Sequence, residues 1–170
     1  MSFPRHDQAD PDSPVRPAGQ GFVLGPDDGE AYWWLGTLTI NKIHGSSTAG
    51  GLDVVEHRVA PHYAPPRHVH RGQDEIFYIV DGDFAVECAG QHQDATPGSL
   101  VFLPRDVPHS FVVGDRVGRA LLFNAPAGFA DLVTELGEPT PTLDLPTPEL
   151  PIPDPARIQE ASQAHGIYPA

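Results

Sequence analysis

The chain has 170 residues, which is enough for one domain with a sizeable core and too few for two full domains. Its 20 prolines and 17 glycines would interrupt long helices, which argues against a helical bundle or a coiled coil. Ten lysines and arginines against 23 aspartates and glutamates give a net charge of −13, which argues against nucleic acid and anionic membrane surfaces as partners.

No stretch approaches the roughly 18 consecutive apolar residues of a membrane-spanning helix, and residues 1–17 lack the apolar region of a secretory signal. We therefore expect a cytoplasmic protein that does not enter a membrane. Cys88 is the single cysteine, so neither an internal disulfide nor a cysteine-rich metal site can form. Its place on one face with Phe84 and Val86 predicts a small buried side chain and not a nucleophile.

Prolines gather near both ends of the chain and indicate three segments. Four lie in residues 1–20 and seven in residues 138–155. We expect residues 1–21 to form a flexible N-terminal arm, residues 22–137 the folded domain with a first helix, and residues 138–170 a proline-rich strap with a short C-terminal helix. The strap is either an extended segment on the domain surface or a disordered linker.

Between the proline-rich ends, the hydrophobic pattern has mostly the two-residue period of β-strands. Residues 31–44 are predicted as one strand. Its apolar and polar residues fall on opposite sides, with Tyr32, Trp34, Leu38 and Ile40 on one and Thr37, Thr39 and Asn41 on the other. Residues 51–59 form another predicted strand. Two β-rich runs, 74–80 and 83–89, are joined by Asp81-Gly82, which is a strong signal for a two-residue hairpin.

The second half of the chain adds three strands and then two helices. The strands are predicted at residues 99–103, 109–113 and 119–124. Short strands about ten residues apart indicate an antiparallel sandwich or barrel. Apolar residues at helical spacing predict a helix over 127–136, and Asp154 with Pro155 predicts the start of a second helix that ends near Gly166.

Histidine is the one over-represented residue type that suggests a chemical function. The chain has nine histidines, and neutral imidazole is the commonest metal ligand. His68 and His70 are two apart on an extended chain, so both point to the same side, which we expect to be a barrel interior. Residues 71–73 are expected to turn the chain so that Glu75 returns beside them, and His109 can supply a third imidazole. Three nitrogens and one carboxylate oxygen suit a first-row transition ion better than calcium or magnesium.

The same residues resemble the two motifs of the cupin family. Most of the first motif, H-x-H-x4-E-x6-G, is matched at His68, His70, Glu75 and Gly82. Most of the second motif is matched at Gly98, Pro104 and His109. The chain departs from the family pattern at His62, Asp106 and Val113. None of these departures replaces a ligand.

The resemblance implies both a fold and a ligand set. The fold would be an all-β antiparallel double-stranded β-helix, the jelly-roll barrel of cupins, with one or two C-terminal helices. Residues 22–137 would form the barrel and the first helix. The ligands of one divalent ion would be His68, His70, Glu75 and His109. The ion can be nickel, iron, manganese, cobalt, copper or zinc. Glu75 can instead stay outside the ligand set and orient a histidine.

Further stretches resemble the small single-domain cupins grouped with quercetin 2,3-dioxygenases. They are residues 32–36, 64–66, 126–129 and 135–137. This resemblance implies a flavonol substrate, dioxygen as co-substrate, and Glu75 as the catalytic base that takes a proton from a substrate hydroxyl. The alternatives are a non-redox metal enzyme, such as an isomerase, lyase or cyclase, and a non-catalytic protein that binds a small molecule.

Other residues are candidates for the surroundings of the ion. Four apolar side chains are predicted to line a substrate pocket above it, or else to serve as barrel core, namely Phe77, Ile79, Phe102 and Phe111. His57 and His62 are predicted not to be ligands, with His62 at the pocket rim. Because a small β domain has edge strands to cover, we expect a homodimer.

Overall fold

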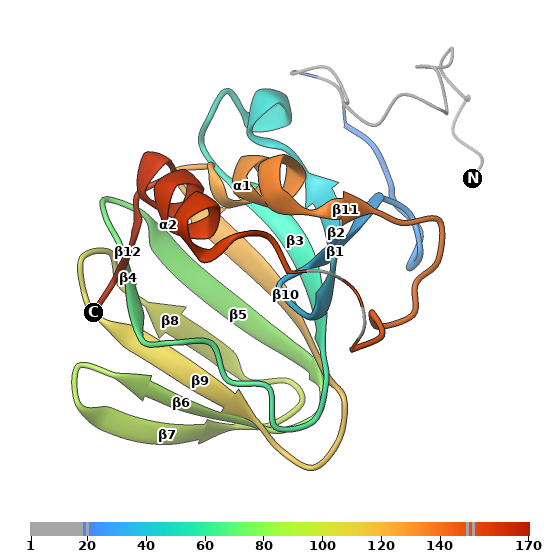
Figure 1. Cartoon of the computed structure of the whole chain (residues 1–170). Helices are drawn as coiled ribbons and strands as arrows, with labels where there is room; N and C mark the ends of the chain where they lie inside the picture. Colours follow the sequence, from blue (N-terminus) through green and yellow to red (C-terminus); the bar gives the residue numbers. More distant parts are fainter. Residues whose placement is uncertain (1–18, 20, 149, 151) are drawn as a thin grey trace, which may run out of the picture.

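Two antiparallel β-sheets face each other and enclose the core (Figure 1). The computed structural model describes residues 19, 21–148, 150 and 152–170, so most of the predicted arm at 1–21 lies outside the described residues. One sheet has seven strands in the order β11-β1-β2-β3-β10-β5-β8, and the other has five in the order β12-β4-β9-β6-β7. The prediction of an all-β jelly roll with C-terminal helices is confirmed.

The chain crosses several times between the two sheets. The seven-stranded sheet contains Glu30–Trp34 (β1), Thr37–Ile43 (β2), Asp53–Val59 (β3), Asp74–Asp81 (β5), Leu100–Leu103 (β8), Gly118–Ala125 (β10) and Glu138–Pro139 (β11). The five-stranded sheet contains His68–His70 (β4), Phe84–Cys88 (β6), Gln91–Ala95 (β7), His109–Val113 (β9) and Ile167–Pro169 (β12). The helices are Gly45–Thr48 (η1, a 3-10 turn), Phe129–Leu136 (α1) and Pro155–Ala164 (α2).

The core lies between the sheets, where every second side chain of a strand points inward. Phe77 and Ile79 on β5 and Leu122 on β10 are buried there. Removing a side chain of this size from water contributes about 1.5–3 kcal/mol to folding. Phe111 on β9 meets Phe77 edge to face, with ring centroids 5.5 Å apart, so the core joins the two sheets.

The predicted strand at residues 31–44 is instead a hairpin of β1 and β2. Leu35 and Gly36 have φ of 48° and 81°, the left-handed conformation of a two-residue turn. The turn puts Trp34 opposite Thr37, and residues directly opposite each other share a face of the sheet. The prediction placed Tyr32 and Trp34 on the side opposite Thr37 and Thr39. In the hairpin these four residues lie on the same face, so the prediction is wrong.

The segment Asp81-Gly82 does not form the predicted hairpin. It carries the chain from β5 in the seven-stranded sheet to β6 in the five-stranded sheet. Gly82 has φ of 76°, and a Cβ atom there would lie 2.7 Å from the carbonyl oxygen of Val117. Only glycine fits at this crossing between the two sheets. Because glycine also favours tight hairpins, the residues Asp81-Gly82 alone do not distinguish a crossing from a hairpin.

Three strands fall outside the ranges predicted from the hydrophobic pattern. β7 has four exposed polar residues and lies at an edge of its sheet, so it lacks the apolar alternation by which strands are recognised. β11 pairs with β1, and the indole nitrogen of Trp33 donates to the carbonyl oxygen of Asp144 at 2.9 Å. The described part of the predicted strap therefore contacts the domain. β12 pairs with β4 along all three residues of each strand.

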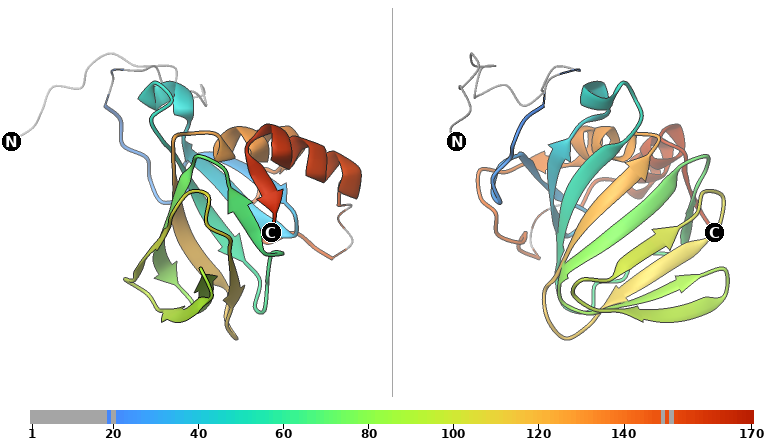
Figure 2. Two further views of the ribbon diagram at one scale, coloured as in Figure 1. Left: turned by 90° about the vertical axis from the view of Figure 1, so that its left-hand side faces the viewer. Right: turned by 180° about the vertical axis from the view of Figure 1, so that it is seen from behind.

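The two helices lie beside each other at one end of the sheets (Figure 2). The Asp53 carboxylate on β3 accepts hydrogen bonds from the backbone nitrogens of Gly128, at 2.7 Å, and Ala130, at 3.1 Å, and so caps α1. Asp154 caps α2 through the backbone nitrogen of Ala156, as predicted. Ala161 of α2 packs on α1 in a small apolar cluster. No helix in the described parts of the chain is long and apolar enough to cross a membrane.

Candidate metal centre

Three imidazoles and one carboxylate converge between the two sheets. His68 and His70 come from β4, and His109 opens β9, where it is paired directly opposite His68. Glu75 comes from β5 of the other sheet. The candidate ligand atoms of these four residues all lie within 4.8 Å of one another. The structure thus brings together the four residues that the sequence grouped as a ligand set.

The route by which Glu75 reaches the histidines differs from the predicted one. We expected the turn at residues 71–73 to return the chain beside β4. Instead, β5 pairs with β10 and β8, while β4 pairs with β12 and β9. Glu75 therefore approaches the imidazoles from the opposite sheet, across the interior, and the cluster connects the two layers of the fold.

Each of the three imidazoles is held through its Nδ1 atom. Nδ1 of His68 lies 3.0 Å from the carbonyl oxygen of Pro66, and Nδ1 of His109 lies 2.9 Å from that of Val107. Nδ1 of His70 lies 2.8 Å from Oε1 of Gln73. All three partners are acceptors, so each Nδ1 carries the proton and each Nε2 keeps a free lone pair. This is the tautomer that binds a metal ion through Nε2.

The Nε2 atoms provide the test of whether the residues fit an ion. Nε2 of His70 and of His109 are buried and have no hydrogen-bond partner among the described residues. They lie 3.9 Å and 3.3 Å from Oε2 of Glu75, so the two nitrogens and the carboxylate oxygen surround one small space. Buried polar atoms without a partner are rare and costly. Coordination of one cation would satisfy both nitrogens and the carboxylate together, so the donor set fits a transition metal ion.

The charges of the site are also those that metal binding needs. Burial lowers the pKa of His68 to about 4, against the opposing charge of Glu75, so this imidazole is neutral near pH 7. Burial alone would raise the pKa of Glu75, but the neighbouring His70 and His109 lower it to about 2. A neutral imidazole and an ionised carboxylate can both coordinate a cation without first losing a proton.

Gln73 holds His70 in place, a role that the polar turn predicted at residues 71–73 does not indicate. Its Oε1 accepts from Nδ1 of His70, and its Nε2 donates to the carbonyl oxygen of Pro126 at 2.8 Å. The side chain therefore fixes the orientation of His70 from a loop that is itself anchored. A glutamine three residues after a candidate ligand is the only sequence signal of this role.

Replacing Gln73 by leucine is expected to weaken metal binding about ten- to a hundredfold, because His70 loses the acceptor that sets its tautomer and ring orientation. A competition titration against a chromogenic chelator would measure the affinity. Gln93→Leu, an exposed change on β7, is the matched control and should leave the affinity unaltered. Equal affinities in Gln73→Leu and the wild type would show that Gln73 does not orient the ligand.

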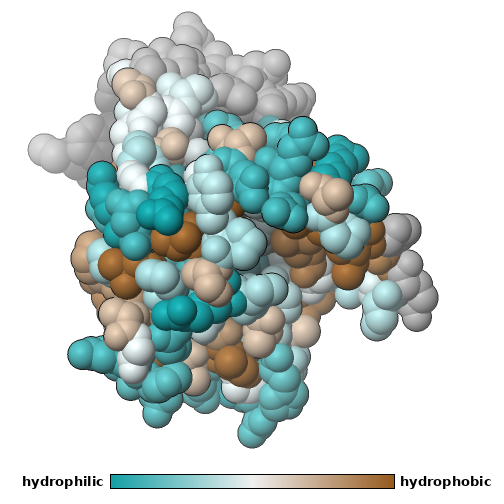
Figure 3. Space-filling model, turned by 60° about the vertical axis from the view of Figure 1, so that its left-hand side comes forward, coloured by the Kyte–Doolittle hydropathy of each residue, from teal (hydrophilic) through white to brown (hydrophobic). Residues whose placement is uncertain are grey.

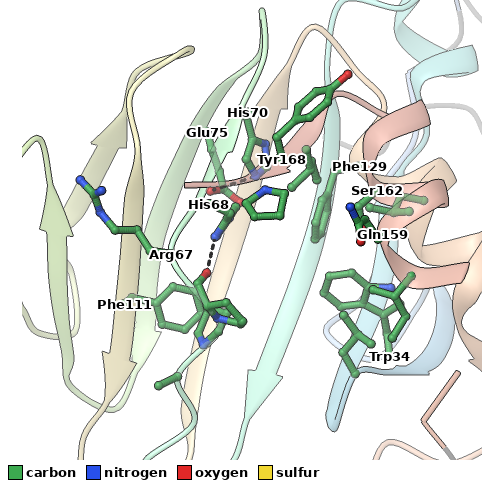
Figure 4. A pocket seen from close by; sticks show the side chains of 18 of the residues that line it. Trp34, Arg67, His68, His70, Glu75, Phe111, Phe129, Gln159, Ser162 and Tyr168 are labelled. Atoms are coloured by element: carbon green, nitrogen blue, oxygen red, sulfur yellow. Dashed lines mark hydrogen bonds and ion pairs between the residues drawn. The ribbon is translucent and has the colours of Figure 1, made fainter. Parts of the chain in front are cut away.

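A pocket of about 560 Å³ opens next to the cluster (Figure 4). His68, His70 and Glu75 are part of its wall, and most of the remaining wall is apolar or aromatic. It is built from β1, β3, β9 and α1, and it is completed by residues 152–169 at the end of the chain. On the molecular face drawn in Figure 3, by contrast, hydrophilic residues surround separate small apolar groups.

Of the four predicted pocket residues, the structure places only Phe111 in the wall of this pocket. Phe77 and Ile79 are 2% and 0% exposed and belong to the core between the sheets. Phe102 is 58% exposed, because Leu103 beside it takes the inward position on β8. The pocket therefore lies nearer the helices than the sequence predicted.

Two other histidines were set aside from the ligand set. His62 is on an exposed loop, where its Nε2 lies 3.7 Å from Asp115, and it does not line the pocket. His57 on β3 does line the pocket, which no pattern in the sequence indicates. Neither residue belongs to the cluster of candidate ligands.

Comparison with known proteins gives the fold and the domain type. Residues 55–123 match the family model described as the cupin domain. The chain is similar to the solved structure of KdgF from Halomonas sp., with 20% identity, coverage of 63% of this chain and 94% of that chain, and a TM-score of 0.55. None of the curated proteins matches the chain.

Two further solved structures show the same similarity. An RmlC-like cupin from Shewanella frigidimarina NCIMB 400 is 23% identical, covers 64% of this chain and 92% of its own, and has a TM-score of 0.52. A predicted oxalate decarboxylase from Thermotoga maritima is 14% identical, covers 62% of this chain and 99% of its own, and has a TM-score of 0.55. Residues 55–123 thus match the model of a cupin domain, and the chain has the cupin fold.

Proposed function

We propose that the protein is a metal-dependent dioxygenase that acts on an enolisable aromatic substrate and cleaves it in the manner of a flavonol 2,3-dioxygenase. The observation that carries this proposal is an ionised carboxylate among three imidazoles at the wall of an aromatic pocket. Such a pocket suits a flat, largely apolar molecule with one acidic hydroxyl.

The wall of the pocket also argues against strongly charged substrates. Besides the cluster itself, Arg67 is the one charged side chain that lines it among the described residues. Nε of Arg67 lies 2.9 Å from Oε2 of Glu87, so its charge is already paired. A sugar phosphate or a dicarboxylate would need more than one free cation for tight binding. A phenolic molecule needs none.

In the proposed reaction, Glu75 is the group that accepts a proton. One of its oxygens can face the ion while the other takes the proton from the enol hydroxyl of the substrate, which leaves an electron-rich enolate. The bound transition ion would supply the Lewis acidity that stabilises this enolate and the one-electron chemistry that dioxygen requires. Phe111 and Phe129 flank the reacting end and keep bulk water from it. For quercetin, the substrate and dioxygen would give a depside and carbon monoxide.

Oxygen uptake tests this proposal. The purified protein is loaded separately with nickel, iron, manganese, cobalt, copper and zinc, and oxygen consumption and loss of quercetin absorbance are followed together. We expect uptake of one dioxygen per quercetin with at least one of these ions. Glu75→Gln should lower the rate at least about a hundredfold, because the amide cannot take the proton. Glu138→Gln, which changes an exposed carboxylate outside both the cluster and the pocket, is the control.

Other outcomes would replace the proposal with a different function. Metal-dependent conversion of quercetin without oxygen uptake would indicate a non-redox enzyme that uses the ion as a Lewis acid. Binding of quercetin without conversion under any metal would indicate a binding protein. An unchanged rate in Glu75→Gln would show that the proton goes to another group.

A further inference from the structure

Two buried nitrogen atoms in the pocket wall have no partner and lie outside the metal cluster. They are Nε1 of Trp34 on β1 and Nε2 of His57 on β3. Neither finds a hydrogen-bond acceptor or donor among the described residues. An unpaired buried polar group costs free energy, so two of them in one wall call for a physical reason.

The neighbours of His57 leave its Nε2 atom without a partner among the described residues. In the sheet, its neighbours on either side are Thr39 and Ala120, which are both small. Tyr63 meets its ring edge to face and Trp34 meets it at a tilt, in each case with ring centroids 6.3 Å apart. His57 is 5% exposed, and its burial lowers its pKa to about 4 against the opposing charge of Glu75. The imidazole is therefore neutral near pH 7.

The two nitrogens come from the sheet opposite the imidazoles of the metal cluster. Trp34 and His57 belong to the seven-stranded sheet, whereas His68, His70 and His109 belong to the five-stranded sheet. Figure 4 shows Trp34 on the opposite side of the pocket from His68 and His70. A molecule that reaches from one side to the other would meet aromatic surfaces between two polar ends.

We infer that Nε1 of Trp34 and Nε2 of His57 form a hydroxyl-binding position, which takes a phenolic hydroxyl on the substrate ring farthest from the metal cluster. The inference rests on the proposed function and specifies its substrate as a polyphenol. The indole N–H donates to the hydroxyl oxygen, and a neutral imidazole can accept from the hydroxyl or donate to it. With no cation in this part of the wall, a neutral hydroxyl fits where a carboxylate or phosphate does not.

Binding of two probes under anaerobic conditions tests the inference without any turnover. Quercetin and 3-hydroxyflavone share the enol group, but 3-hydroxyflavone lacks the hydroxyls on the outer rings. Calorimetry on the metal-loaded protein gives the ratio of their dissociation constants. We expect wild type to prefer quercetin about tenfold, and we expect His57→Phe and Trp34→Phe each to move this ratio toward one. Trp33→Phe removes an indole outside the pocket and is the matched control.

The melting temperature separates this role from a structural one. Both nitrogens are buried and unpaired, so their apolar replacements should keep or raise the melting temperature while the preference for quercetin is lost. The inference is overturned if both variants keep the wild-type ratio of dissociation constants, whether their affinity for the two probes is unchanged or is lowered equally for both. In those cases oxygen uptake with quercetin can still support the proposed function. If wild type binds neither probe, the inference and the proposed substrate class fail together.

Discussion

Replacing His70 by alanine is expected to remove the metal ion from the protein. The change deletes one of three imidazole ligands and leaves Oε1 of Gln73 without its donor. We expect the affinity for a divalent transition ion to fall by more than about a hundredfold, since even the loss of an outer partner costs ten- to a hundredfold. Oxygen uptake with quercetin should fall to the background rate. Elemental analysis after dialysis measures the ion content directly.

The control for this experiment is His62→Ala. His62 is also a histidine close to the site in sequence, but it lies on an exposed loop outside the ligand cluster. Its replacement should leave the ion content unchanged. Added metal should also raise the melting temperature of the wild type and of His62→Ala, and not that of His70→Ala, because an ion stabilises only the state that binds it. Full ion content in His70→Ala would contradict the assigned ligand set.

Replacing Ala161 by aspartate is expected to detach α2 from the domain. Ala161 is 4% exposed and packs against Leu132 and Leu136 of α1, so the new carboxylate would be buried without a partner. We expect a loss of about 2–4 kcal/mol in the free energy of unfolding, measured by urea denaturation. The pocket wall contributed by Ile158 and Ser162 would also be lost, so quercetin should bind about tenfold more weakly.

The matched control is Ala164→Asp, the same change at an exposed position of the same helix. It should lower the free energy of unfolding by no more than about 1 kcal/mol, the cost of an acidic side chain at the carboxyl end of a helix, and it should leave quercetin binding unchanged. The ion content of Ala161→Asp should stay near that of wild type, because α2 provides no candidate ligand. Quercetin binding of wild-type strength in Ala161→Asp would show that α2 is not needed to close the pocket.

The strands and helices that depend on local patterns could be predicted from the sequence. Inward and outward residues alternate along β9 and β10, and the helices at Phe129–Leu136 and Pro155–Ala164 have clear apolar spacing or a capping residue. The sheet to which each strand belongs could not be predicted. Asp81-Gly82 has the sequence of a hairpin, but the partners of β5 and β6 are chosen by contacts between distant segments.

Some residues of the candidate site could likewise be predicted from the sequence, and others could not. His68 and His70 could be paired from sequence because the two-residue period of a strand fixes their common side. Trp34 could not be placed, because its side depends on the left-handed turn at Leu35 and Gly36. Nor could His57, because its environment comes from β1, β2 and the loop at Tyr63. The common side of His68 and His70 is fixed by local geometry, whereas Glu75, His109 and the pocket are brought together by the packing of distant segments.

The pairing of β4 with β12 would couple the binding of an ion to the docking of residues 167–169. Two candidate ligands lie on a strand of three residues, and Ile167 pairs with His70 while the backbone nitrogen of Arg71 donates to Gly166. Order in residues 166–169 and order in the ligand strand therefore support each other. By thermodynamic reciprocity, whatever free energy an ion gains from a docked carboxyl-terminal strand, the strand gains from the ion.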